Sequence, residues 1–296
     1  MSADKRDAVL RLARETGLGR ASIAVRTLAA SGASAATVDL DSARAIYPAS
    51  MLKTPIAMVL ARQISAGIRR REDTTVIASE NMTANDAPSP LAPGYRTTIG
   101  DLADRMVARS DNVATNVLID VLGRETLTAG CHELGLGRTS VHRKLSGSLP
   151  LIDDPAATGR NSHPACDAAR AFELISAESR DGFAWVYDAL RAQIWNGKLS
   201  PGFDASDVFA HKTGDTDEQS HDGGILSLPD GRRFIIVVYT EAGADPHSDA
   251  AFTAFACGLR VLLADPDLHS SPVGVPASDG RIGPGHNTTG SKQSNP

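Results

Sequence analysis

Cysteine is scarce in this chain of 296 residues, which contains three cysteines at widely separated positions. Cys131, Cys166 and Cys257 lack the C-x-x-C spacing of metal sites and the density of a disulfide scaffold. We therefore expect buried free thiols, and we expect neither a metal centre nor a disulfide framework.

Long apolar runs and dense basic runs are also missing. The N-terminal segment, residues 1–17, carries charges every few positions and has no apolar core of the kind found in signal peptides. The sequence as written predicts a cytoplasmic protein without a membrane partner, although a chain trimmed of a secretory leader would look the same. Because the net charge is −5 and no basic patch stands out, nucleic acid is not an expected partner. The oligomeric state stays open.

The composition that remains, 42% hydrophobic and 22% charged, is typical of a globular protein with a substantial core. Apolar spacing distinguishes helices from strands along the chain. It predicts helices at residues 5–17, 51–64, 98–107, 112–122, 165–179, 182–195 and 249–263. It predicts strands at residues 21–28, 36–40, 208–212, 224–228 and 234–240.

The order of these elements predicts two interleaved lobes. Residues 1–47 and 200–265 supply all the predicted strands, so one sheet is expected to form from both chain ends. Residues 48–199 are expected to form a helical lobe, and a cleft between two such lobes is a favoured place for a small-molecule substrate. Residues 266–296 are rich in Pro, Gly, Ser and Asn, which favours a disordered tail.

Three short motifs carry candidate chemistry: Ser50-Met51-Leu52-Lys53 at a helix start, Ser110-Asp111-Asn112 between helices, and Lys212-Thr213-Gly214 at a strand end. Each motif alone occurs often by chance, but all three in this order and local context do not.

The first motif has a direct physical interpretation. A serine hydroxyl is a poor nucleophile at neutral pH and needs a base within hydrogen-bond reach. Helix positions i and i+3 share one face, so Lys53 can bring its amine beside Ser50. Burial or a second cation such as Lys212 would lower the pKa of that amine and let it act as a base. The free N–H groups of the helix start favour an oxyanion near Ser50.

Taken together, the three motifs are the signature of class A β-lactamases and penicillin-binding proteins. The chain resembles this superfamily over roughly residues 5–264. The resemblance also includes SDNVATNVLIDVL at 110–122, LGL at 134–136, HKTG at 211–214 and HDGGIL at 221–226. It implies an α/β fold, with an antiparallel sheet flanked by helices plus an all-helical lobe, and it implies an acyl-enzyme mechanism without a cofactor.

The resemblance also implies residue roles. Ser50, Lys53, Ser110 and Lys212 would be catalytic, with Ser110 relaying a proton to the leaving nitrogen. Asn112 would bind the substrate amide, and Lys212 and Thr213 a substrate carboxylate. The backbone N–H groups of Ser50 and Asp215 would form the oxyanion hole. The residues expected to bind substrate are Asn112, Thr213, Gly214 and Asp215.

The sequence departs from this family pattern at two places. Class A β-lactamases use a loop glutamate to activate the water that hydrolyses the acyl-enzyme, but residues 140–164 contain no Glu. The only acids there are Asp153 and Asp154, so slow deacylation is expected. Strand alternation places Asp215 on the side of Thr213, where its carboxylate would repel a substrate carboxylate unless it turns to solvent or pairs with Lys or Arg.

Other polar and aromatic residues have simpler interpretations. His211 is expected to lie in the core or behind the site. His221 and Asp222 are spaced like a metal pair, but no third ligand is at hand, which favours a solvated loop. The aromatic residues Trp185, Tyr187 and Trp195 are interpreted as core residues of the helical lobe.

Three functions remain open at this stage. The first is a serine hydrolase that acts on β-lactams or a related amide. The second is an esterase, peptidase or acyltransferase on the same scaffold. The third is a binding or sensing module that is acylated once and stays acylated.

Overall fold

A computed structural model describes residues 3–28, 34–146, 158–177 and 182–264. The predicted tail at 266–296 lies outside these ranges, as do Asp153 and Asp154.

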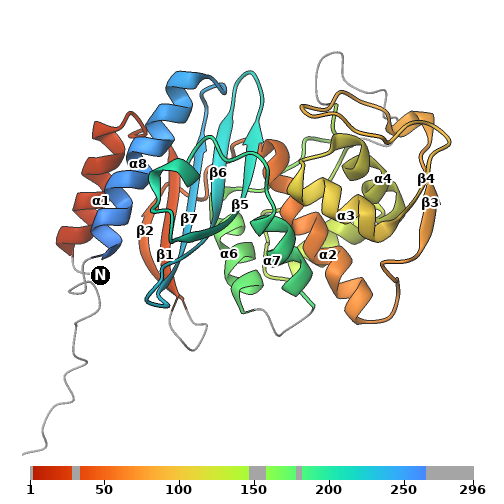
Figure 1. The fold of residues 1–296 in the computed structure, drawn as a ribbon, viewed down its shortest axis with the longest axis horizontal. Coiled ribbons are helices and arrows are strands. Elements are labelled where there is room, and N and C mark those ends of the chain that lie inside the picture. Colours follow the sequence, from red (N-terminus) through yellow and green to blue (C-terminus); the bar gives the residue numbers. More distant parts are fainter. Residues whose placement is uncertain (1–2, 29–33, 147–157, 178–181, 265–296) are drawn as a thin grey trace, which may run out of the picture.

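The centre of the molecule is a five-stranded antiparallel sheet with the order β2-β1-β7-β6-β5 (Figure 1). Its strands are β1 (Ser22–Leu28), β2 (Ser34–Leu40), β5 (Val208–Asp215), β6 (Ser220–Ser227) and β7 (Arg233–Thr240). The strands come from both ends of the chain, and the fold class expected from the sequence is confirmed.

Four of the strands, β2, β5, β6 and β7, are longer than predicted, and the difference is largest in β5 and β6. Strand β6 begins at Ser220 rather than at residue 224. The prediction started too late because Gly223 and Gly224 weaken the strand pattern in the sequence, whereas in the structure their lack of a side chain fits the crowded sheet centre. A Cβ atom on Gly224 would lie 2.2 Å from the carbonyl oxygen of Ala210. Strand β5 continues to Asp215, so the whole third motif lies within a strand.

The sheet buries both of its faces. On β7, Ile236 and Val238 face a cluster that includes Phe252 of α8, while Ile235 and Val237 belong to the cluster on the opposite face. This alternation is the period of two expected of a strand. Helices α1 (Ala3–Glu15) and α8 (Pro246–Ala264) cover the first face. Helix α6 (Ala165–Ser176) packs against β1, β6 and β7 on the second.

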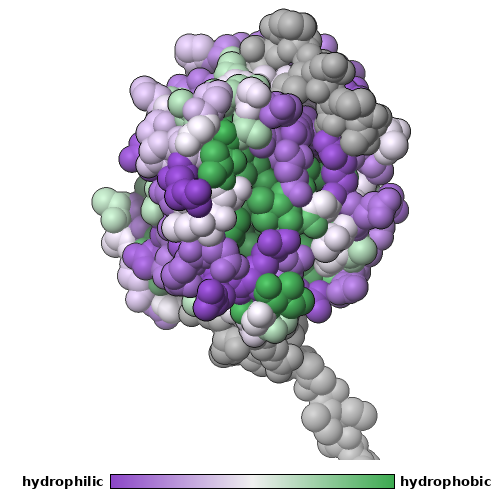
Figure 2. All heavy atoms as spheres, turned by 90° about the vertical axis from the view of Figure 1, so that its right-hand side faces the viewer, coloured by the Kyte–Doolittle hydropathy of each residue, from purple (hydrophilic) through white to green (hydrophobic). Residues whose placement is uncertain are grey.

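Helix α2 (Lys53–Ser65) is the core of the remaining elements, and its first nine residues are all buried. It is preceded by the 3₁₀ turn η1 (Ala49–Leu52), so the predicted helix at 51–64 begins as a tighter turn. The same part of the molecule contains α3 (Ile99–Ala108), α4 (Asn112–Leu122), α5 (Arg124–Glu133), α7 (Ala184–Arg191), β3 (Thr74–Val76), β4 (Arg96–Thr98) and the 3₁₀ turn η2 (Ser79–Asn81). A further 3₁₀ turn, η3 (Ser200–Gly202), packs against α8 instead. Figure 2 faces the end with β3 and β4, where hydrophilic side chains surround a central group of apolar ones.

The two-lobe division of the chain remains a prediction, and α6 packs on the sheet from within the range 48–199. One expectation about the thiols is wrong: Cys131 is buried, whereas Cys166 is half-buried and Cys257 is exposed. None of the described helices is both long enough and apolar enough to cross a membrane.

Candidate active site

Ser50 lies in the turn η1, directly before α2. The residue before it, Ala49, has a φ of +47°, a conformation that L-residues with a side chain rarely adopt. Strand β5 packs against this turn, and a Cβ atom on Gly214 would lie 3.0 Å from the carbonyl oxygen of Pro48. Gly214 therefore allows the third motif to approach the Ser50 backbone closely.

Lys53 joins the first two motifs at its ammonium nitrogen. This Nζ atom is fully buried, 2.8 Å from Ser50 Oγ, 3.0 Å from Ser110 Oγ and 2.7 Å from Asn112 Oδ1. It also lies 2.5 Å from the carbonyl oxygen of Ser110. Burial, and after it the charge of Lys212, lowers the pKa of Lys53 well below its usual value. A neutral amine beside Ser50 can accept the hydroxyl proton.

Ser110 bridges the two lysines. Its Oγ accepts hydrogen bonds from Lys53 and Lys212, both at 3.0 Å. The link between α3 and α4 is so short that Ser110 adopts a left-handed φ of +58°. Asp111 then begins α4 by accepting a hydrogen bond from the backbone N–H of Ala114 at 3.0 Å. The helix cap thus holds Ser110 in an orientation that faces both amines.

Lys212 is fully buried in β5 and donates to Ser110 Oγ and, at 2.9 Å, to the carbonyl oxygen of Thr213. Its pKa is lowered to about 7, chiefly by burial. The carboxylate of Asp215 acts in the opposite direction, and the Lys198 charge lowers the pKa further. Near neutral pH, Lys212 is therefore poised between its charged and neutral forms.

The motif residues open on a pocket of about 110 Å³. Its lining consists of Ser50, Asp86, Ser110, Trp195, Thr213, Gly214, Asp215 and Ala244. Two of these residues change the interpretation of the sequence. Trp195 is half-buried in the wall of the pocket, so its assignment as a core aromatic is wrong. Asp86 was not anticipated, because it lies in a Pro- and Asn-rich loop that matches no motif and has no periodicity.

Asn112 lies behind the pocket rather than in its lining. Its Oδ1 accepts from Lys53, and its Nδ2 donates to the carbonyl oxygen of Ala84 at 2.9 Å. Both ends of the amide group are therefore engaged within the protein, and the visible role of Asn112 is to orient the Lys53 amine. Its predicted contact with a substrate amide stays a prediction.

Asp215 pairs with Lys198, which fulfils one of the alternatives considered for this carboxylate. Lys198 is buried, and it also donates to the carbonyl oxygen of His221 at 3.2 Å. The Asp215 side chain keeps 39% of its surface exposed and faces the pocket. Lys198 belongs to no motif, and only its long-range pairing with Asp215 identifies it.

The histidines next to the third motif are structural. His211 is buried, with Nδ1 2.8 Å from Asp222 Oδ1, as expected of a core residue. His221 and Asp222 are also fully buried in β6, so the expectation of a solvated loop is wrong. His221 stacks on Tyr239 with ring centroids 4.1 Å apart. Among the described residues, no group of three or more His, Cys, Asp or Glu side chains could hold a metal ion.

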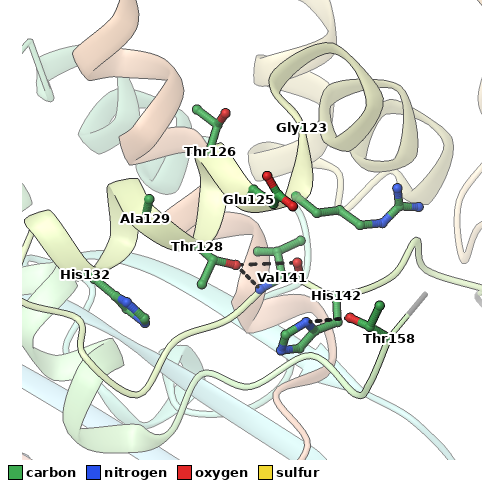
Figure 3. A pocket seen from close by; sticks show the side chains of 10 residues that line it. Gly123, Glu125, Thr126, Thr128, Ala129, His132, Val141, His142 and Thr158 are labelled. Atoms are coloured by element: carbon green, nitrogen blue, oxygen red, sulfur yellow. Dashed lines mark hydrogen bonds between the residues drawn. The ribbon is translucent and has the colours of Figure 1, made fainter. Parts of the chain in front are cut away.

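A larger cavity of about 710 Å³ lies elsewhere on the molecule (Figure 3). Residues of α5 line one side, and His142 and Thr158 line the other. None of the motif residues reaches it. The chemistry therefore belongs to the smaller pocket, which contains Ser50.

The fold and the clustering of these groups around Ser50 define a serine hydrolase. A family model described as the β-lactamase enzyme family matches residues 4–256, and the chain belongs to that family. It is accordingly a serine hydrolase of the β-lactamase type.

Individual relatives are distant in sequence. The extended-spectrum β-lactamase PER-1 of Pseudomonas aeruginosa is 23% identical over 242 residues, covering 73% of this chain and 76% of the relative. The structure of PBP-A superposes with a TM-score of 0.74 at 22% identity, covering 87% of this chain and 96% of the other. A β-lactamase from Sphaerobacter thermophilus gives a TM-score of 0.71 at 22% identity, covering 90% and 99%.

Proposed function

We propose that Ser50 is acylated by a β-lactam or a related amide and that the resulting acyl-enzyme is hydrolysed slowly. One observation carries the proposal: the buried Lys53 amine lies 2.8 Å from Ser50 Oγ, and its pKa is strongly lowered. A lowered pKa favours the neutral amine, and the neutral amine is the form that can act as the base a serine nucleophile requires.

In the acylation step, Lys53 accepts the proton of Ser50 while Oγ forms a bond to the substrate carbonyl carbon. The backbone N–H groups of Ser50 and Asp215 stabilise the oxyanion that develops on the carbonyl oxygen. The bond to the leaving nitrogen then breaks, and Ser110 passes a proton to that nitrogen. Ser110 suits this relay because its Oγ contacts both Lys53 and Lys212, from which the proton is replaced.

Slow deacylation is supported by the missing acid, since residues 140–164 contain no glutamate. An ester at Ser50 would then lack the usual base for activating water. A mutant of PBP-A, which has a TM-score of 0.73 with this chain at 20% identity, has been described as an acyl-enzyme complex with penicillin G. We propose the same covalent state for this chain.

A second candidate function is hydrolysis or transfer of an acyl group from a substrate other than a β-lactam. Asp215 favours this alternative because its carboxylate faces the pocket where a β-lactam carboxylate would bind. A permanently acylated sensor is the third candidate, and it differs from the others only in the fate of the ester.

One experiment separates the three candidates. The protein is incubated with a chromogenic cephalosporin and, separately, with a short p-nitrophenyl ester, while turnover and intact mass are followed. The proposed function predicts acylation by the cephalosporin with slow turnover. Turnover of the ester without labelling by the cephalosporin would favour the second candidate, and labelling without any turnover the third.

The lysines should dominate the acylation rate. We expect Lys53→Ala and Lys212→Ala each to slow acylation by more than about 100-fold, because a general base and an electrostatic contact each supply roughly that factor. Stopped-flow mixing with the chromogenic substrate measures the rate, and thermal melting checks the fold. An unchanged rate in the Lys53→Ala variant would exclude this residue as the base.

The pH dependence of acylation should follow the ionisation of the Lys212 amine. Its folded pKa of about 7 means that the ammonium is present below that pH and is lost above it. We expect kcat/KM for acylation to fall as the pH rises through about 7. Lys212→Arg, whose guanidinium stays charged, should move this fall to higher pH. The same midpoint in both proteins would show that another group titrates.

A further inference from the structure

The charged groups of the active site are arranged unequally around the pocket. Among the described residues of its lining, two are acidic, Asp86 and Asp215, and none is Lys or Arg. The three lysines nearby, Lys53, Lys198 and Lys212, are buried, with exposed fractions of 0%, 4% and 0%. A substrate entering the pocket therefore meets carboxylates first.

The amines of these lysines are already engaged within the protein. Lys53 has acceptors in the first and second motifs, and Lys212 donates to Ser110 and Thr213. Lys198 forms an ion pair with Asp215, the last residue of β5. The carboxylate of Asp215 thus pairs with Lys198 within the protein, so the charge of this lysine is already compensated before a substrate enters.

Trp195 adds an aromatic wall to the same pocket. Its indole N–H donates to the carbonyl oxygen of Arg109 at 3.1 Å, so the part of the side chain that remains for a ligand is aromatic surface. Aromatic faces attract ammonium groups and offer nothing comparable to a carboxylate. Two carboxylates and an indole in one small pocket suit a cation.

The leaving group is the part of the substrate that meets these residues. Ser110 donates the proton to the leaving atom in the proposed mechanism, and its Oγ lies 3.0 Å from Lys212 Nζ on β5. Asp215 ends the same strand, three residues beyond Lys212. In that mechanism the leaving side of the scissile bond lies beside Ser110, which lines the same pocket as Asp215 and Asp86.

We propose that this enzyme selects substrates whose leaving group carries an ammonium, and that Asp215 and Asp86 discriminate against a carboxylate there. This inference rests on the proposed function, because it assigns a substrate class to the pocket of Ser50. It implies that a β-lactam, whose leaving side carries a carboxylate, acylates Ser50 more slowly than an otherwise similar substrate with an ammonium there. The covalent step is unchanged: Oγ replaces the leaving atom on the acyl carbon, the leaving atom receives a proton, and water later releases the acid.

Three thioesters of one acyl group test the inference. Phenylacetyl esters of thiocholine, mercaptoethanol and mercaptoacetate differ in leaving-group charge, which is positive, neutral and negative. Hydrolysis is followed by chromatography of the released phenylacetate at low ionic strength. We expect kcat/KM to decrease in that order. Asp86→Asn and Asp215→Asn should each reduce the cation-to-anion ratio of kcat/KM by roughly tenfold, as expected for removing one nearby charge.

Asp217→Asn is the matched control, because it removes the same charge from an exposed residue outside the pocket lining and should leave the ratio unchanged. Asp215→Asn also deprives Lys198 of its partner and can weaken the fold. Asp86 is exposed, so Asp86→Asn provides a test without that complication.

The possible outcomes distinguish the charge selectivity from the proposed function. Ser50-dependent hydrolysis of all three esters at equal rates, or a preference for the anion, overturns the charge selectivity and leaves the proposed function standing. A cation-to-anion ratio of kcat/KM that stays constant in both Asp86→Asn and Asp215→Asn also overturns the charge selectivity and leaves the proposed function standing. Enzymatic hydrolysis that persists in Ser50→Ala, or a wild type that is acylated neither by the esters nor by the chromogenic cephalosporin, removes the proposed function. A wild type that is acylated by the cephalosporin but by none of the esters overturns the charge selectivity alone.

Discussion

Ser50→Ala is expected to abolish both covalent labelling and hydrolysis, while the protein stays folded. Ser50 Oγ lies 2.8 Å from the Lys53 amine, lines the pocket and stands directly before helix α2. Removing it takes away the bond-forming atom, so the loss should be complete rather than partial.

The fold should survive this substitution for a physical reason. Lys53 keeps its contacts with Ser110 and Asn112 when Oγ is lost, so no buried amine is left without an acceptor. Thermal melting should therefore change little. Ser65→Ala, at the exposed end of the same helix, serves as a control that should label normally. A mass increase on Ser50→Ala after incubation with a β-lactam would refute the assignment of the nucleophile.

Helices with clear end signals were predictable from the sequence. The bounds of α4 match the expected residues 112–122, because Asp111 caps its N-terminus and Gly123 ends it with a φ of +82°. Helix α5 was not predicted, because its sequence has a weak apolar pattern. Leu127 and Cys131 are its only fully buried apolar side chains, and Gly130 weakens the helical pattern. That glycine is explained only by packing, since a Cβ atom there would lie 3.0 Å from Val59.

The site residues that belong to motifs were predictable from the sequence. The residues that reach the site only through contacts between distant segments were not. Ser50, Ser110 and Lys212 were named from their local contexts, and the structure brings them together at hydrogen-bond distance of the Lys53 amine or of each other. Asp86 and Lys198 acquire their roles only when distant loops meet β5. No local spacing encodes such a contact, because the partners are set by the packing of the whole chain.

Acylation by a β-lactam is expected to outrun deacylation, giving a burst of product followed by slow turnover. In a class A enzyme a loop glutamate acts as general base for the second step, and losing such a base should slow that step by about 10² to 10⁴-fold. The acyl-enzyme should then persist long enough to appear as a mass increase on the peptide that carries Ser50. Rapid-quench kinetics measures the burst amplitude, which should approach one product molecule per enzyme.

Three carboxylates are candidates for the general base of deacylation, and single substitutions distinguish them. Asp153 and Asp154 lie in the loop that lacks a glutamate but outside the described residues, while Asp86 shares the pocket with Ser50. A base must come within about 3 Å of a water beside the ester. If none does, Asp153→Ala, Asp154→Ala and Asp86→Asn should leave the slow phase unchanged. A large loss of turnover in one variant alone would identify the base, and rapid turnover without a burst in the wild type would show that deacylation is not impaired. We expect the slow phase to persist in all three variants, because residues 140–164 contain no glutamate to serve as the base.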